Sequence, residues 1–172
     1  MQTFRYEGDM KTIVIYDSQF GNTAQIAERI GDGLRDAQQA PEAVEVIRVG
    51  DVHLSQVGEG DLVIVGSPTQ KFNPTPAIRA FLKGIPGDRL LNVKVAAFDT
   101  RLSEGKMREM SALLGWMVRI FGYAAAPIAK QLERRGGTLV LPPQGFYVED
   151  MEGPLLEGEL ERAAAWVEQI IE

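Results

Sequence analysis

Residues 11–30, KTIVIYDSQFGNTAQIAERI, decide the fold of this chain. The apolar run Ile13–Tyr16 predicts a buried strand, which ends in a short polar turn, Ser18–Thr23. Beyond the turn, isoleucines recur at helical spacing, at Ile26 and Ile30. A strand that passes through a tight turn into a helix is the unit from which layered α/β proteins are built.

The turn between this strand and this helix has the features of a phosphate-binding site. The first N–H groups of a helix lack intrahelical partners, and the helix dipole is positive at that end. The hydroxyls of Ser18 and Thr23 add donors, and Gly21 lets the backbone approach an anion closely. No Lys or Arg occurs between Asp17 and Glu28. Neutral donors would therefore hold the phosphate, unlike in the lysine-bearing nucleotide loop.

Composition excludes several classes of protein. The chain has 172 residues, of which 45% are hydrophobic and 24% charged, as expected for one globular domain. It contains no cysteine, which excludes disulfides, thiolate metal sites and cysteine catalysis. Its single histidine, His53, supplies neither a metal centre nor a triad, so we expect no metal and no catalytic side chain. The net charge of −6 argues against nucleic-acid binding.

Strand and helix patterns alternate along the chain. Strands are expected at 12–16, 44–49, 62–65, 93–98 and 138–141, the last continuing through 146–148. Helices are expected at 23–38, at 75–83, within 105–135 and at 157–171. The strand runs are almost uninterrupted, which is typical of strands buried on both faces of a parallel sheet. The pattern predicts a three-layer α/β sandwich.

A single domain is expected over residues 11–172, with an extension outside the fold at residues 1–10. The first residues are polar and do not have the pattern of a secretion signal, so the cytoplasm is the expected location.

In a sheet of this kind, ligands bind beyond the carboxyl ends of the strands. The loop after the third strand, 66–76, contains three prolines, several polar side chains and Phe72, which suits a planar ring ligand. An ordinary surface loop that leads into the next helix would have the same residues. The loop after the fourth strand, 99–105, would present backbone N–H groups to the same ligand. Alternatively, Asp99 and Arg101 would form a local ion pair there.

From Lys11 to Glu172 the sequence resembles the flavodoxins and the wider flavodoxin-like FMN-binding family. The resemblance rests on Ser18-x-Phe20-Gly21-Asn22-Thr23, on Gly66-Ser67-Pro68-Thr69 at the end of the third strand, and on the succession of strands. It implies a five-stranded parallel sheet in the order 2-1-3-4-5 with helices on both faces. Phe20 stands where the family has a threonine, so this chain lacks one hydroxyl donor.

The resemblance also implies that FMN binds non-covalently, with its phosphate on 18–23 and its ring against 67–73 and 99–105. The residues expected at the cofactor are Ser18, Gln19, Phe20, Gly21, Asn22, Thr23, Ser67, Pro68, Thr69, Gln70, Lys71, Phe72, Asn73, Asp99, Thr100, Arg101 and Gly105. Many flavodoxins hold the ring between a Trp and a Tyr, whereas these loops offer only Phe72. Lys71, if it lies near the ring, would favour the anionic reduced flavin. We therefore expect a higher redox potential than in a typical flavodoxin.

Competing families fail on particular residues. A response-regulator receiver needs an Asp at the end of the third strand, where this chain has Val65-Gly66-Ser67. The dinucleotide fingerprint, the lysine-bearing phosphate loop and the serine elbow of hydrolases are all absent.

An apolar insert is expected at about 105–122, rich in methionine and aromatic residues from Met107 to Tyr123. A short helix at about 106–120 is expected there, ahead of the helix that runs to about Arg135. The insert either folds onto the protein's own core or exposes an apolar surface. Such a surface would contact a redox partner protein, a second subunit, a membrane surface or a quinone-like substrate. Trp116 would then be one candidate for the missing ring contact.

Two classes of function remain open, with a third behind them. The first is a flavodoxin-like electron-transfer protein that passes electrons from a reductase to an acceptor. The alternative is an FMN-dependent oxidoreductase of the NAD(P)H:quinone type, which reduces a quinone or a similar small molecule. The third is a binding module on the same scaffold without FMN. The sequence identifies neither the electron donor nor the acceptor.

Overall fold

The computed structural model describes residues 10–38, 41–59 and 61–171. The first nine residues of the expected extension lie outside this part. The strands are β1 (Thr12–Tyr16), β2 (Val44–Arg48), β3 (Leu62–Pro68), β4 (Lys94–Arg101), β5 (Thr138–Leu139) and β6 (Gln144–Tyr147). The helices are α1 (Asn22–Gln38), α2 (Pro76–Gly84), α3 (Glu104–Met110), α4 (Ala112–Phe121), α5 (Ala125–Arg134) and α6 (Glu159–Glu168). Short 3₁₀ turns occupy Pro41–Ala43, Val49–Asp51 and Leu54–Gln56.

The strands form one parallel sheet in the order β2-β1-β3-β4-β5, which confirms the predicted order, and β6 also pairs with β4. The predicted fifth strand is present as two pieces on successive halves of β4. Val95 pairs with Leu139 of β5, and Thr100 pairs with Phe146 of β6. The gap between the pieces contains Pro142 and Pro143, which have no N–H for a strand ladder.

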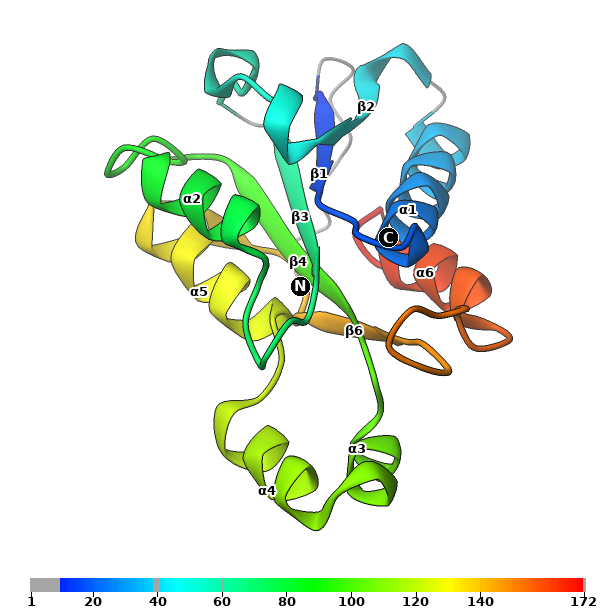
Figure 1. Cartoon of the computed structure of the whole chain (residues 1–172). Helices are drawn as coiled ribbons and strands as arrows, with labels where there is room; N and C mark the ends of the chain where they lie inside the picture. Colours follow the sequence, from blue (N-terminus) through cyan, green and yellow to red (C-terminus); the bar gives the residue numbers. More distant parts are fainter. Residues whose placement is uncertain (1–9, 39–40, 60, 172) are drawn as a thin grey trace.

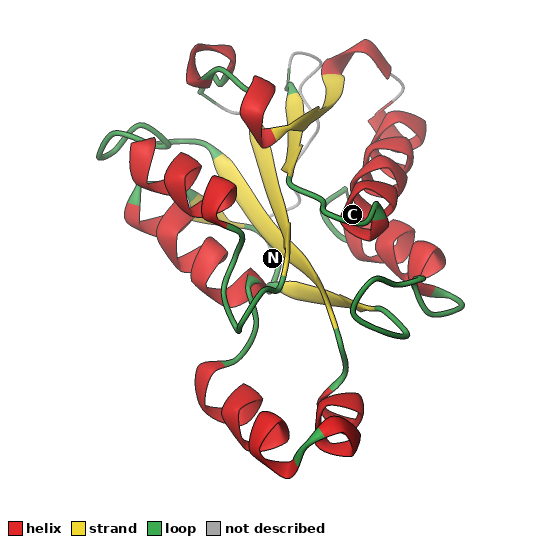
Figure 2. Cartoon of the chain, in the orientation of Figure 1, coloured by secondary structure: helices red, strands yellow, loops and turns green. Residues whose placement is uncertain are grey.

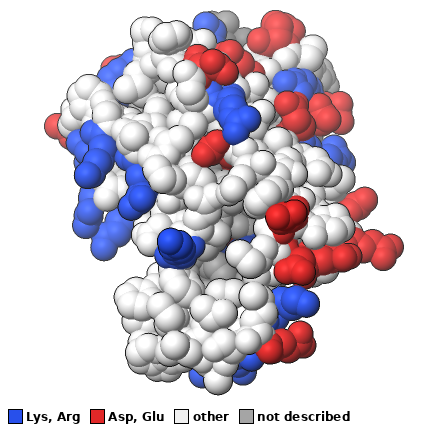
Figure 3. Space-filling model, in the orientation of Figure 1, with Lys and Arg blue, Asp and Glu red and all other residues white. Residues whose placement is uncertain are grey.

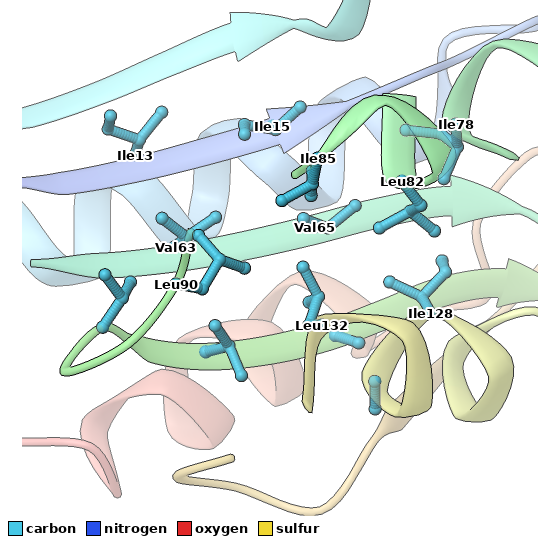
Figure 4. Packing of buried hydrophobic residues seen from close by; sticks show 14 of the residues in the cluster. Ile13, Ile15, Val63, Val65, Ile78, Leu82, Ile85, Leu90, Ile128 and Leu132 are labelled. Atoms are coloured by element: carbon cyan, nitrogen blue, oxygen red, sulfur yellow. The ribbon is translucent and has the colours of Figure 1, made fainter. Parts of the chain in front are cut away.

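Helices cover both faces of the sheet, as predicted (Figures 1 and 2). Helices α2 and α5 lie on one face, where their apolar residues pack against β1, β3 and β4. Figure 4 shows this packing, with Ile78 and Leu82 of α2 and Ile128 and Leu132 of α5 directed at Val65 and its neighbours. Helices α1 and α6 cover the other face.

An aromatic cluster lies on the α1–α6 side. The rings of Phe98, Phe146 and Trp166 meet edge to face, with centroids 6.1 to 6.3 Å apart. Phe98 is fully buried, and its ring lies so close to the backbone of Gly66 on β3 that a methyl group at Gly66 would overlap it. A glycine is therefore required at this point of a central strand.

The insert forms two short helices, α3 and α4, so the prediction of one helix at 106–120 was wrong. Ser111 separates them in an extended conformation, with φ −167°. The N–H of Ser111 donates to the carbonyl of Met107 at the end of α3, and its side chain makes no capping hydrogen bond to α4. The turn brings Gly115 of α4 against the side chain of Arg108 on α3. We call residues 104–121 the α3–α4 hairpin; in Figure 1 it projects from the sandwich beyond the end of β4.

The segment Ala112–Arg134 has the length and apolar composition of a membrane span. It consists of two separate helices, α4 and α5, which are divided at Gly122, where φ is +69°. Ile128 and Leu132 of α5 belong to the buried core. The segment is therefore not one continuous spanning helix.

Candidate functional site

The loops after β1, β3 and β4 meet around a cavity of about 900 Å³ at the carboxyl edge of the sheet. Small-molecule sites have volumes of about 300–1,000 Å³. The sequence-predicted residues that line the cavity are Ser18, Gln19, Phe20, Asn22, Thr23, Pro68, Thr69, Gln70, Lys71, Phe72, Asn73, Thr100 and Arg101. The structure thus brings most of the predicted residues to one place.

Four predicted residues do not line the cavity: Gly21, Ser67, Asp99 and Gly105. Ser67 is buried, and its hydroxyl accepts the N–H of Thr75 at 3.0 Å and donates to the carbonyl of Pro68 at 2.9 Å. Ser67 therefore stabilises the second loop by bonding to its backbone at both ends, without contacting the cavity. Gly105 lies in the first turn of α3. Gly21 has the positive φ that the turn of the first loop requires. Asp99 forms an ion pair with Arg101, which does line the cavity.

The first loop offers a set of free backbone donors. The hydroxyl of Ser18 accepts the N–H of Gly21 at 3.1 Å, and Gly21 has φ +92°, which favours glycine. In the described residues, no hydrogen bond uses the N–H groups of Gln19, Phe20, Asn22 or Thr23. These donors lie at the N-terminus of α1, where the helix dipole favours an anion. The loop fits a phosphate group.

A cation lies behind this loop, and no sequence pattern predicts it there. Nη2 of Arg48, at the end of β2, donates to the carbonyl of Ser18 at 2.6 Å and lies 3.3 Å from Oδ1 of Asp17. Arg48 pairs in register with Tyr16, so its proximity could have been found once the order of β2 and β1 was known. It offsets the negative charge of Asp17, which would otherwise repel an anion.

A buried hydrogen bond connects the first loop with β4. The Oγ1 atoms of Thr23 and Thr100 are 2.8 Å apart. Both residues are at least nine-tenths buried, and both line the cavity. The two hydroxyls therefore fix the spacing between the first loop and the third loop.

The second loop ends in a tight two-residue turn. Gln70 and Asn73 exchange backbone hydrogen bonds of 2.8 and 2.9 Å. Lys71 and Phe72 between them have φ values of +46° and +67°, a conformation that non-glycine residues rarely adopt. The turn holds Phe72 at the cavity, where its ring centroid lies 5.9 Å from that of Phe121 in the hairpin. The backbone is strained where a ligand would be contacted, a combination found at functional sites.

The third loop is built on a buried ion pair. Oδ1 and Oδ2 of Asp99 accept from Nε and Nη2 of Arg101 at 2.5 and 2.7 Å. Oδ2 also accepts the N–H of Ala125 at 2.7 Å. Burial raises the pKa of Asp99 above its ordinary value, against the opposite effect of Arg101. The local ion pair considered for this loop is thus present, with its carboxylate fully buried.

Arg101 is enclosed on two further sides. Its Cζ lies 3.9 Å from the ring centroid of Tyr123, and the absence of a side chain at Gly145 leaves room for the guanidinium. Tyr123 lines the cavity and is the aromatic residue that the third loop lacked in the sequence prediction. Burial raises the pKa of its phenol. Tyr123 lies between α4 and α5, two residues before α5 begins at Ala125, and it does not follow a strand that would have placed it at the ligand edge of the sheet.

The α3–α4 hairpin forms an apolar wall of the cavity through Met107, Met110, Leu114 and Val118. Trp116 does not line the cavity, and 57% of it is exposed. It lies with Leu113 and Ile120 on the outward face of α4, and all three are exposed. In Figure 3 the hairpin surface is mostly uncharged.

The loop after β6 closes another side of the cavity through Val148, Met151 and Glu152. The carbonyl of Glu152 accepts from the amide of Asn22 at 3.0 Å, so this loop is fastened to the N-terminus of α1. Acidic residues gather on this side of the molecule (Figure 3). In the described residues, no cluster of His, Cys, Asp and Glu has the composition of a metal site.

Comparison with known proteins decides the family. The family model of flavodoxins matches residues 14–166. The chain belongs to the flavodoxin family. The cofactor of flavodoxins is FMN. No curated protein matches the chain in sequence.

Solved structures show the same fold. An archaeal flavodoxin is 23% identical, with 94% of this chain and 96% of that chain covered and a TM-score of 0.66. Flavodoxin 1 from Bacillus cereus is 21% identical, with 94% and 97% covered and a TM-score of 0.68. Rubredoxin oxygen:oxidoreductase from Desulfovibrio gigas is 23% identical and has a TM-score of 0.66. That alignment covers 94% of this chain and 35% of the oxidoreductase.

The residues of this chain fit FMN at both ends of the cavity. The free N–H groups of the first loop suit the phosphate, although Phe20 replaces a threonine whose hydroxyl would have been a further donor. At the other end, Phe72 and Tyr123 offer aromatic surface and the hairpin offers apolar side chains.

Proposed function

We propose that this member of the flavodoxin family is an electron-transfer protein that binds FMN non-covalently. In this proposal the phosphate lies on 18–23 and the ring lies between the second loop, 67–73, and the third loop, 99–105. The observation that carries it is a single cavity with unpaired backbone donors at one end and aromatic and apolar residues at the other. FMN accepts and donates the electrons, while the chain orients the cofactor and excludes water from it.

FMN binding is tested on the purified protein. We expect it to be yellow and to release one FMN per chain on denaturation. FMN added to the apoprotein should raise the melting temperature, because a ligand at 100 times its Kd stabilises by about 2.7 kcal/mol. Riboflavin, which lacks the phosphate, should bind more weakly because it leaves the N–H groups of the first loop free. An apoprotein that does not bind FMN would instead support the binding module without a flavin.

A second candidate, the FMN-dependent oxidoreductase, is favoured by one observation. Met107, Met110 and Leu114 of the hairpin enclose the ring end of the cavity in apolar surface, which suits a flat apolar acceptor such as a quinone. Rapid reduction by NADH or NADPH with steady turnover of a soluble quinone would favour this candidate. Reduction only through a separate reductase would favour the electron carrier.

We also propose that the outward face of the hairpin contacts the redox partner protein. Flavodoxins transfer electrons to partner proteins. The exposed Leu113, Trp116 and Ile120 form an apolar centre on α4, and the ion pair between Arg119 and Glu104 lies on the same hairpin. An apolar centre with a polar rim is the usual composition of a protein interface. For a soluble protein of this fold, we propose a cytoplasmic location.

Replacing Leu113, Trp116 and Ile120 together by serine tests this surface. Because all three are exposed, we expect FMN content and melting temperature to stay nearly unchanged. Electron transfer in an assay reconstituted with a reductase and an acceptor protein should slow by about tenfold, as for loss of an aromatic interface residue. Sedimentation of the wild type as a dimer, or its flotation with lipid vesicles, would assign the face to a second copy or a membrane instead.

A further inference from the structure

Arg101 is a cation held in one position at the cavity. Two of its nitrogens bind Asp99, its guanidinium lies over the ring of Tyr123, and it occupies the space that a side chain at Gly145 would fill. Only 16% of its side chain is exposed. Its Nη1 makes no hydrogen bond in the part of the chain that the structure describes. A donor and a positive charge are therefore available at the cavity in a fixed geometry.

The other cations that line the cavity are placed differently. Lys71 and Arg79 are exposed, so water and salt screen their charges. Arg101 is largely buried, where charges interact more strongly because the surroundings are less polarisable. Asp99 lies behind Arg101 and does not line the cavity. The ion pair thus presents its positive end to the ligand.

We infer that Arg101 raises the redox potential of the flavin by stabilising its reduced form relative to its oxidised form. This inference rests on the proposed FMN site. Uptake of two electrons and one proton by a neutral oxidised flavin ring leaves one negative charge on the ring. A fixed cation favours that charged product over the neutral starting form, and charge near the ring is one means by which a protein tunes a flavin. The carboxylate of Asp99 has the opposite effect from a greater distance.

The variant Arg101→Gln tests the inference, with Arg108→Gln as its matched control. Arg108 is an exposed arginine of the hairpin, paired with Glu104, and does not line the cavity. For Arg101→Gln we expect the preference for reduced over oxidised FMN to fall by about tenfold, which corresponds to a two-electron potential lower by about 30 mV. Arg108→Gln should leave the potential unchanged. Redox titration and FMN affinity in both oxidation states provide the measurements.

A second variant, Asp99→Asn, should move the potential in the opposite direction. Its amide oxygen can still accept the N–H of Ala125, while the negative charge behind Arg101 is lost. We expect a higher potential than in the wild type. Opposite shifts in the two variants separate an electrostatic role from a structural one, because disruption of the loop would weaken both oxidation states alike.

An unchanged potential in Arg101→Gln, or a lower potential in Asp99→Asn, would overturn the inference while leaving the FMN site intact. If Arg101→Gln does not fold, the Asp99→Asn measurement decides alone. A wild-type protein that binds no FMN would overturn the proposed function, and this inference with it.

Discussion

Replacing Gly66 by alanine should lower the free energy of unfolding by about 3 kcal/mol, the largest stability effect that we expect from one methyl group in this protein. The added methyl would overlap the ring of Phe98. Phe98 cannot move away easily, because it is fully buried against Phe146 and Trp166. Nor can the backbone, because Gly66 lies on β3 between β1 and β4. Urea denaturation of the apoprotein measures the change.

Two further variants identify the cause. Gly84→Ala, at the end of α2, has no atom within 4 Å of the added methyl and should be neutral or slightly stabilising. The double variant Gly66→Ala/Phe98→Leu should be less destabilised than the sum of its two single variants, because the smaller side chain makes room. Strict additivity would show that overlap with Phe98 is not the reason.

Replacing Gly21 by alanine should weaken FMN binding by about 30-fold. Gly21 has φ +92°, a conformation that costs a residue with a side chain about 1–3 kcal/mol. Nothing lies within 4 Å of the added methyl, so the effect comes from the backbone alone. The first loop should relax away from the geometry that gathers its N–H groups. A cost of about 2 kcal/mol reduces the binding-competent fraction, and therefore the affinity, by about 30-fold.

Fluorescence titration of the apoprotein with FMN measures this loss. Gly50→Ala provides the control, because Gly50 is exposed, does not line the cavity and has no atom within 4 Å of the added methyl. Riboflavin should bind the wild type and Gly21→Ala with similar affinities, since it has no phosphate for the first loop. An equal loss for riboflavin and FMN would show that the loop does not hold the phosphate.

The sequence was sufficient for the sheet and the main helices because their patterns are long and local. Uninterrupted apolar runs identified strands such as β1, and helical spacing identified α1. The break in the fifth strand lies at Pro142 and Pro143, and from the sequence the strand was expected to continue past them. The helix predicted at 106–120 was wrong because its break at Ser111 depends on the packing of Gly115 against Arg108.

The candidate site was predictable where its residues follow strands directly. The first two loops emerge next to each other because β1 and β3 are adjacent in the sheet. Tyr123 and Arg48 were missed because they reach the site through tertiary packing, from before α5 and from the end of β2. Asp99 was placed at the ligand by its position in sequence, whereas in the structure it lies behind Arg101. Spacing along a chain does not tell which way a side chain points from a loop.

The short contact between the hydroxyls of Thr23 and Thr100 also has a direction. Each hydroxyl carries one proton, so in this pair one must donate and the other accept. If Thr23 donates its proton to a ligand oxygen, Thr100 has to donate to Thr23. The hydroxyl of Thr100 is then unable to donate to any other acceptor. A ligand bound beside α1 would then determine the orientation of the Thr100 hydroxyl on β4. The hydrogen-bond direction of one hydroxyl therefore depends on that of the other, which couples the two sides of the cavity.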